Sequence, residues 1–170
     1  MITSRSAWGA LAASALGLEG AALYYQHGLH LDPCVLCIYQ RTAVLGLLIA
    51  ALIGLVAPAR RWLRAPAYVL WGVSAGWGLS LAAKQAGIQL GVIKAVLGCS
   101  FDADFPSWAK LDQWLPWMFR PTGYCDEIQW QFLGLSMSQW MVGIFVAYLI
   151  ALAMVLLAEI RSSARGVSRL

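Results

Sequence analysis

Charged residues are scarce in this chain. Only 12% of its 170 residues are Asp, Glu, Lys or Arg, whereas 61% are apolar and the mean hydropathy is +0.68. Soluble domains average about 25% charged residues, so the composition argues against a soluble globule and for an integral membrane protein. The net charge of +4 does not indicate a nucleic-acid partner, because the arginines lie in short stretches between apolar segments and form no basic face.

Long apolar runs are what the chain has in quantity. A helix needs about 20 apolar residues to cross a hydrocarbon core of about 30 Å, because lipid cannot satisfy exposed backbone groups. Four stretches qualify, and we predict transmembrane helices over about 7–26, 38–56, 67–83 and 140–158. Pro58 and Pro66 are expected to bracket the turn between the second and third helices. The sequence therefore predicts one all-α membrane domain, 1–170, built as an antiparallel bundle of four transmembrane helices.

The arginines predict the orientation of this bundle. Seven basic residues lie before the first span, between the second and third, or after the fourth: Arg5, Arg60, Arg61, Arg64, Arg161, Arg165 and Arg169. By the positive-inside rule these parts and both termini are cytoplasmic, which leaves 27–37 and 84–139 as outer loops. Alternatively, the first span is a cleaved signal peptide, because one arginine precedes it and small residues lie near Ala13 and Ala15.

The longer outer loop has one apolar stretch. Residues 111–119 (LDQWLPWMF) combine tryptophans with little charge, which favours a short helix lying flat in the membrane interface. Pro116 is expected to limit its length. The alternative is a buried hydrophobic turn of a small cap.

Four cysteines, Cys34, Cys37, Cys99 and Cys125, fall in the two outer loops. Cys34 and Cys37 form a C-V-L-C motif, whereas 25 residues separate Cys99 from Cys125. A zinc site would need a second close pair of ligands, so no metal is expected, although a structural zinc site is one alternative. Permanent disulfides that staple the outer loops are another, because exported cysteines usually pair and stay paired.

The position of the C-V-L-C motif favours redox chemistry. The motif opens a membrane helix, and a helix N-terminus and a nearby cation both stabilise a thiolate. Arg41 follows Cys37 by four residues, one helical turn along the same face. An arginine at that depth either snorkels to the headgroups or meets a partner. If Arg41 meets a partner, the carbonyl oxygen of a membrane quinone fits, because a quinone takes two electrons from a dithiol.

Two longer stretches carry a family resemblance. They are CVLCIYQR at 34–41, and FPSWAKLDQWLP with GYCDEIQWQFLGL between 105 and 135. With these stretches the chain closely resembles the disulfide bond formation protein B (DsbB) family, and the resemblance covers nearly the whole chain. It implies an inner-membrane oxidoreductase that reoxidises a DsbA-like periplasmic thioredoxin-fold dithiol oxidase and reduces ubiquinone or menaquinone. Besides membrane lipid, that oxidase is the implied partner.

The resemblance also implies an electron path. The reduced partner would attack a Cys99–Cys125 disulfide at Cys99, and the freed Cys125 would attack a Cys34–Cys37 disulfide at Cys34. The Cys37 thiolate would then pass electrons to quinone beside Arg41.

One part of the family pattern differs here. Some members have a histidine and a glutamine early in the long outer loop, where this chain has Gln85 and Gln89 and no histidine. Gln89 is the better candidate for a quinone contact and Gln85 the weaker one, with ordinary interfacial polar residues as the alternative. Glu19, inside the first span, is expected to make a structural hydrogen bond or to handle protons.

Two other functions compete with this one. A vitamin-K-epoxide-reductase-like protein also has a four-helix bundle, a C-x-x-C motif and quinone chemistry, but there the motif lies late in the bundle. A structural membrane protein with two permanent disulfides is the non-enzymatic alternative.

Overall fold

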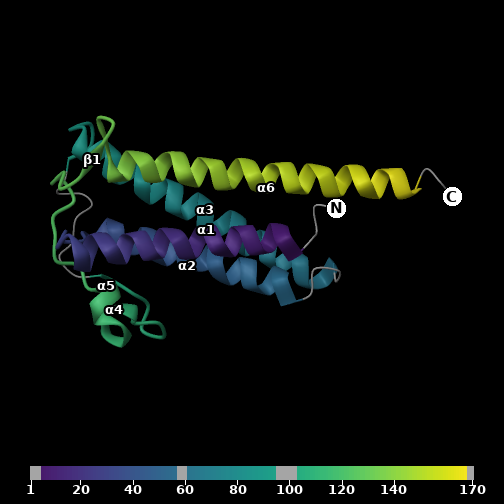
Figure 1. Ribbon diagram of the computed structural model, residues 1–170, viewed down its shortest axis with the longest axis horizontal. Helices are drawn as coiled ribbons and strands as arrows, with labels where there is room; N and C mark the ends of the chain where they lie inside the picture. The colour runs from purple at the N-terminus through teal and green to yellow at the C-terminus, as the bar shows by residue number, and fades with distance from the viewer. Residues whose placement is uncertain (1–4, 57–60, 95–102, 168–170) are drawn as a thin grey trace.

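Four long helices form a rod in the computed structural model, which describes residues 5–56, 61–94 and 103–167. They are α1 (Arg5–Leu23), α2 (Val35–Val56), α3 (Arg61–Gln89) and α6 (Met137–Val167). α2 packs between α1 and α3, and α6 packs along α3. Successive long helices run antiparallel, so the start of α1 and the end of α6 share one end of the rod, and the small elements lie at the other (Figure 1). The mostly helical structure confirms the predicted all-α class.

Close helix packing depends on small residues. The Trp8 ring of α1 lies over Gly54 of α2, where a Cβ would collide with the indole. Apolar burial does not drive helices together in lipid, so membrane helices commonly use small residues to let backbones approach. The core of the bundle is accordingly rich in fully buried alanines: Ala15, Ala50, Ala51, Ala67, Ala75 and Ala82.

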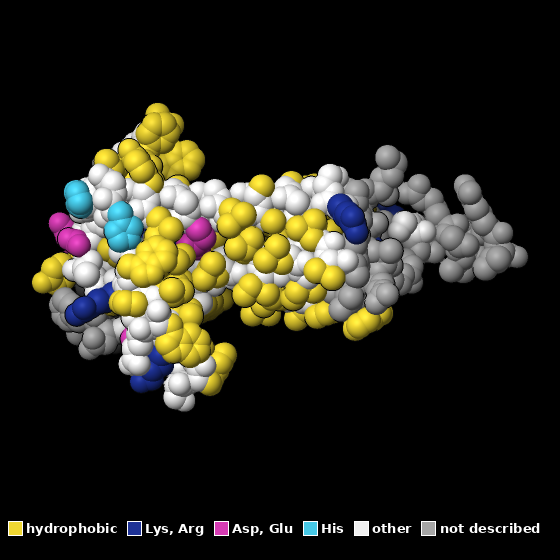
Figure 2. Space-filling view, turned by 60° about the horizontal axis from the view of Figure 1, so that its bottom comes forward, with side chains coloured by type: hydrophobic (Ala, Val, Ile, Leu, Met, Phe, Trp, Pro, Cys, Tyr) yellow, Lys and Arg dark blue, Asp and Glu magenta, His cyan; other side chains and the backbone are white. Residues whose placement is uncertain are grey.

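The outside of the rod is apolar. Each long helix exposes large hydrophobic side chains, including Leu16, Leu52, Val73 and Ile150, and Figure 2 shows such side chains spread along the middle of the rod. Soluble monomers rarely expose an apolar surface of this extent. By length and composition, α2 and residues 137–162 of α6 could cross a membrane; α1 and α3 do not meet that criterion over their described residues. The chain is therefore a membrane protein.

α3 extends beyond its predicted limits at both ends. Pro66, expected to bracket the preceding turn, lies inside α3 as its sixth residue, so the hydrogen bond that an N–H at this position would donate to the Trp62 carbonyl is missing. Residues 84–89, predicted as the beginning of the outer loop, are also helical. The sequence prediction ended the helix at the first polar residues, whereas here Gln85 and Ile88 of that stretch turn inwards and are buried.

The end of α3 is defined by a glycine. Gly91 has φ +73°, and its N–H donates to the Ile88 carbonyl at 3.0 Å. The Val92 N–H donates to the Gly87 carbonyl at 2.9 Å. This pair of bonds is the Schellman arrangement, in which glycine readily adopts the left-handed conformation.

The outer end contains only short elements. A π-helical turn, η1 (Tyr24–Gly28), continues α1. Residues 111–119 form two single turns, α4 (Leu111–Trp114) and α5 (Pro116–Phe119), instead of one helix. The break falls at Leu115 (φ −133°, ψ 63°), because a residue before proline is disfavoured in the helical region. Phe119 is fully buried, so this part of the stretch is a hydrophobic turn packed on the bundle.

A small hairpin, which the sequence did not predict, leads into α6. β1 (Gln131–Phe132) pairs antiparallel with β2 (Leu135–Ser136). The two residues between them, Leu133 and Gly134, have φ of +53° and +78°, as a type I′ turn requires.

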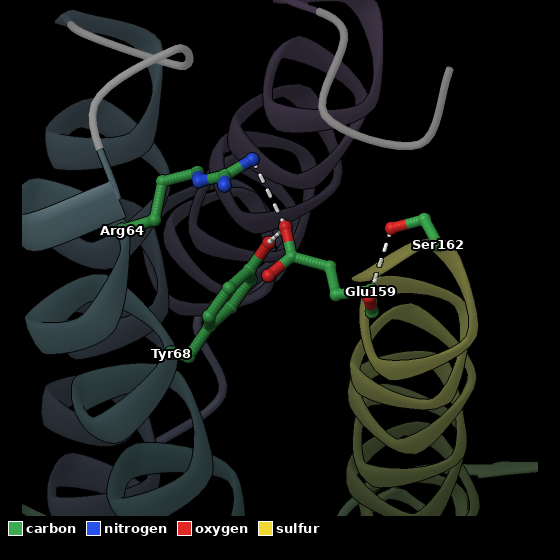
Figure 3. Close-up of polar contacts among 4 residues, drawn as sticks. All are labelled: Arg64, Tyr68, Glu159 and Ser162. Carbon is green, nitrogen blue, oxygen red and sulfur yellow. Dashed lines mark hydrogen bonds and ion pairs between the residues drawn. The ribbon is translucent and has the colours of Figure 1, made fainter. Parts of the chain in front are cut away.

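A polar clamp joins α3 to α6 at the opposite end of the rod (Figure 3). The Arg64 Nη1 lies 3.0 Å from the Glu159 Oε1, and the Tyr68 hydroxyl donates to the same oxygen at 3.0 Å. The Ser162 hydroxyl donates to the Glu159 backbone carbonyl at 2.8 Å. This clamp holds the far end of α6 against α3.

Candidate active site

Cys34 occupies the N-cap of α2. Pro33 precedes it, and α2 begins at Val35. The Cys34 sulfur accepts the backbone N–H of Cys37 at 3.3 Å, as the oxygen of a Ser or Asp N-cap does in other helices. Both sulfurs therefore lie at the positive end of the α2 dipole, which stabilises a thiolate.

The two sulfurs of the motif are close together. The Cys34 and Cys37 Sγ atoms lie 2.8 Å apart, and both cysteines are free. A disulfide has an S–S distance of about 2.05 Å, so oxidation of the pair to a disulfide needs only a small displacement of the sulfurs. The hydrogen bond to the Cys37 sulfur, followed by burial, raises the pKa of the Cys34 thiol. Cys34 is thus the member of the pair that keeps its proton.

Gln85 of α3 contacts both sulfurs. Its Nε2 lies 3.2 Å from the Cys34 Sγ and 3.2 Å from the Cys37 Sγ. Its Oε1 accepts a hydrogen bond of 2.7 Å from the Nε2 of Gln40. The sequence placed Gln85 near a quinone, and the structure places its amide against the sulfurs.

Arg41 is buried among protein groups. Its guanidinium donates to the Met118 carbonyl at 2.9 Å, to the Ala22 carbonyl at 3.2 Å, and to the Gln26 side chain. Only 9% of the residue is exposed, so Arg41 does not snorkel. It links α1, α2 and α5 one turn below Cys37.

A cavity opens beside this dithiol, between α1, α2, α3 and α6. Its lining combines polar groups with apolar side chains: Glu19, Cys37, Arg41, Leu18, Val44 and Met141. Glu19 is 6% exposed, and neither of its carboxylate oxygens has a hydrogen-bond partner among the described residues. Of the two expectations for Glu19, the structural hydrogen bond is thus not found within the described ranges, and the proton role stays a prediction. A buried polar group without a partner is costly, which marks this wall of the cavity as a place for a polar ligand atom.

Gln89 lies on the same cavity wall. Its Oε1 accepts the hydroxyl of Ser136 at 2.7 Å and that of Ser138. Its Nε2 lies 3.4 Å from the Glu127 carbonyl oxygen. Gln89 thus ties the end of α3 to the start of α6 and to the outer loop. The two serines were not singled out from the sequence, although an S-x-S pair directly before an apolar run was a usable signal.

Cys125 lies beside the C-V-L-C motif. It is fully buried and disulfide-bonded, and it belongs to the same apolar cluster as Cys34 and Ile88. Cys99, its predicted partner, lies outside the described residues.

A short strap, residues 122–125, positions Cys125. The backbone N–H groups of Thr122 and Gly123 donate to the Pro33 carbonyl at 2.9 and 3.1 Å. The Thr122 hydroxyl donates to the Asp32 carboxylate at 2.9 Å. A Cβ on Gly123 would collide with the Asp32 backbone carbonyl. The strap therefore lies directly on the residues that precede Cys34.

These features define a class of protein. A helical membrane bundle holds a free cysteine pair at a helix N-terminus, next to a cavity with a buried arginine and a buried carboxyl group. Among the residues that the structure describes, no three His, Cys, Asp or Glu side chains gather as potential metal ligands. The site is that of a membrane thiol–disulfide protein.

Comparison with known proteins identifies the family. The family profile described as "Disulfide bond formation protein DsbB" matches residues 4–155. Disulfide bond formation protein B of Aeromonas salmonicida (strain A449) is 54% identical over 156 residues, which cover 92% of this chain and 90% of that protein. The protein of the same name from Shewanella amazonensis is 50% identical over 161 residues, 95% of each chain. The chain belongs to the DsbB family, as its sequence motifs predicted.

Proposed function

We propose that this protein is a protein-dithiol:quinone oxidoreductase. It would reoxidise a DsbA-like periplasmic dithiol oxidase and pass the electrons to membrane quinone, which drives disulfide bond formation. One observation carries the proposal: two free sulfurs lie 2.8 Å apart at a helix N-terminus and border a cavity that contains a buried arginine. This arrangement favours a thiolate that can donate electrons to a ligand.

The first stage is exchange with the partner protein. A thiolate of the reduced partner attacks Cys99 of the Cys99–Cys125 disulfide and releases Cys125. The second partner thiol then displaces Cys99, so the partner leaves with a disulfide, and this chain holds two thiols. Both steps are thiol–disulfide exchanges in which one S–S bond breaks as another forms.

The second stage moves the electron pair within the chain. Cys125 attacks Cys34, breaks the Cys34–Cys37 bond and releases Cys37 as a thiolate. Cys99 then displaces Cys34, which restores the Cys99–Cys125 disulfide. The placement of Cys125 in one apolar cluster with Cys34 supports attack at Cys34.

The third stage takes place at the cavity. A bound quinone supplies the oxidising power, because its ring accepts two electrons and two protons. Cys37 gives up the electron pair, closure of the Cys34–Cys37 bond oxidises both sulfurs, and the Cys34 thiol releases its proton. The second proton has to come from water, because the Cys37 thiolate has none to give. Arg41 is proposed to donate a hydrogen bond to a quinone oxygen, with Gln89 and Gln85 as further contacts on the same wall. Ubiquinone and menaquinone share the carbonyl groups that this contact needs.

The residues of the cavity suit a quinone. Leu18, Val44 and Met141 provide apolar walls, whereas Arg41 provides a donor. Glu19, which has no hydrogen-bond partner in the described part of the chain, provides a carboxyl group next to the same space. An apolar pocket with a few convergent polar groups is the usual form of a small-molecule site.

The proposed setting is the bacterial inner membrane. α1, α2, α3 and α6 would each cross it, with both termini cytoplasmic and the cysteines at the periplasmic end. The segment of α4 and α5, which exposes Trp114 and Trp117, would rest in the periplasmic interface. A periplasm-active reporter fused after Arg64 should be silent, and activity there would overturn this orientation.

The direct test of the activity uses the purified chain in detergent with a DsbA-like dithiol protein and a short-chain ubiquinone. Quinone absorbance should fall as the dithiol protein is oxidised, and the Cys37→Ser variant should show no such fall. If the wild-type chain leaves the quinone oxidised, the proposed function is wrong.

A further inference from the structure

We propose that Gln85 is the hydrogen-bond donor that stabilises the reduced Cys34–Cys37 pair, and that Gln40 is the positioning residue that points its amide at the sulfurs. The pair would then be a stronger oxidant than the same two cysteines without Gln85. This inference rests on the proposed function, because it assigns a role in the thiol chemistry of that site.

The geometry of Gln85 matches this role. Its Nε2 is 3.2 Å from each of the two sulfurs, and a primary amide nitrogen has two N–H groups to donate. A hydrogen bond to an ionised acceptor is roughly twice as strong as one between neutral groups. The Cys37 thiolate therefore gains more from Gln85 than a neutral thiol does.

Gln40 determines which end of the Gln85 amide faces the sulfurs. The two ends of a glutamine amide have nearly the same shape, so the neighbours select the orientation. The Gln40 Nε2 donates to the Gln85 Oε1 at 2.7 Å, which directs the Gln85 N–H groups at Cys34 and Cys37, although the same oxygen also lies 3.7 Å from the Cys37 sulfur. Gln40 and Gln85 are only 4% and 5% exposed, so water cannot readily replace a lost partner.

The redox consequence follows from the two states of the pair. Reduction of the Cys34–Cys37 disulfide takes two electrons and one proton and gives one thiol and one thiolate. Sulfur in a disulfide is a weak acceptor, whereas a thiolate accepts strongly, so the Gln85 donor favours the reduced state. A dithiol whose reduced form is stabilised is a stronger oxidant. Gln85 thus poises the pair to accept electrons from Cys125.

Substitution of each glutamine by methionine tests this role, because methionine has a similar length and no N–H group. The full chain, without added quinone, is equilibrated with dithiothreitol, and differential alkylation with mass spectrometry measures the oxidised fraction of Cys34 and Cys37. Gln85→Met should shift the exchange constant about tenfold towards the disulfide, equivalent to a potential about 30 mV lower for a two-electron couple. Gln40→Met should shift it less, in the same direction.

The double variant separates positioning from direct contact. Because Gln40 acts through Gln85, Gln40→Met together with Gln85→Met should shift the constant no further than Gln85→Met alone. Gln113→Met, at an exposed glutamine of α4, is the matched control and should match the wild type. Additive shifts from the two sites would overturn the positioning role of Gln40.

If the Gln85→Met chain folds poorly, a second readout on Gln40→Met still tests the proposal. The rate at which iodoacetamide alkylates Cys37 at fixed pH follows the thiolate fraction, and Gln40→Met, which changes no sulfur contact directly, should lower it. An exchange constant and an alkylation rate equal to those of the wild type would overturn the proposal. Neither measurement involves quinone or a partner protein, so failure here is distinct from a wild type that does not reduce quinone.

Discussion

Replacing Arg41 by methionine tests how the cavity holds its ligand. The substitution removes the guanidinium one turn below Cys37 and keeps an unbranched side chain in its place. It also removes the donors that reach the Met118 and Ala22 carbonyls. Two effects are therefore expected, one on quinone binding and one on the stability of the bundle.

The expected magnitudes follow from hydrogen-bond energies. A hydrogen bond from a charged donor contributes about 1.5–3 kcal/mol, and each 1.4 kcal/mol is a factor of ten in affinity. Loss of the Arg41 contact should therefore weaken quinone binding about 10- to 100-fold. Each carbonyl left without its donor should lower the free energy of unfolding by about 1–3 kcal/mol.

The assay measures the Kd of a short-chain ubiquinone by equilibrium dialysis on the folded variant. Arg64→Met is the matched control, because Arg64 has a side chain only 11% exposed and binds Glu159 at the opposite end of the rod. That control should lose stability and keep the wild-type Kd. Formation of the mixed disulfide between Cys99 and the partner should be unaffected in both variants.

Two results would contradict the proposed contact between Arg41 and quinone. If Arg41→Met folds and binds quinone with the wild-type Kd, then Arg41 serves only to link α1, α2 and α5. If Arg64→Met weakens quinone binding as much as Arg41→Met does, the effect comes from general loosening of the bundle and the contact is again refuted.

Three further predictions concern other parts of the chain. Gly123→Ala should slow the exchange between Cys125 and Cys34 about 10- to 100-fold, because the added Cβ would collide with the Asp32 backbone. Rapid-quench alkylation measures the exchange rate. A wild-type rate in the variant would show that the strap does not position Cys125. The raised pKa of Cys34 means that the folded reduced chain binds more protons than the unfolded one above pH of about 8.5. In thermal melts, the reduced protein should therefore lose stability as pH rises beyond that point, whereas the oxidised protein, which has no thiol there, should not. Parallel plots of melting temperature against pH for the two proteins would contradict the raised pKa of Cys34. Glu159→Gln should lower the free energy of unfolding by about 1–3 kcal/mol, because the ion pair with Arg64 is lost. The Kd for quinone should not change. A changed Kd would contradict this prediction and show that the two ends of the rod are coupled.

The long helices were predictable because their signal is local. An apolar run of about 20 residues identifies a helix whatever it packs against, and all four predicted spans lie within helices that the structure describes. Their ends were less predictable. Residues 84–89 look like the start of a loop because they open with Lys84 and Gln85, yet Gln85 is buried against the sulfurs of another helix. Only the tertiary contact explains why the helix continues.

The residues of the site likewise divide into those that the sequence could place together and those that it could not. Cys34, Cys37 and Arg41 are close in sequence, so helical spacing was enough to place them together. The contacts of Gln40 with Gln85 join α2 to α3, and no spacing rule reports such a pair. The strap that brings Cys125 to Cys34 depends in the same way on backbone hydrogen bonds to Pro33, which sequence pattern does not encode.

In the proposed mechanism, electrons leave the chain through Cys37 to quinone. A single-turnover measurement tests this path: the chain is reduced, excess reductant is removed, and the loss of quinone absorbance is followed after mixing. The wild type should reduce quinone as its Cys34–Cys37 disulfide forms, and Cys37→Ser should leave quinone oxidised although Cys99 and Cys125 are present. Equal quinone loss in both proteins would contradict the proposed electron path.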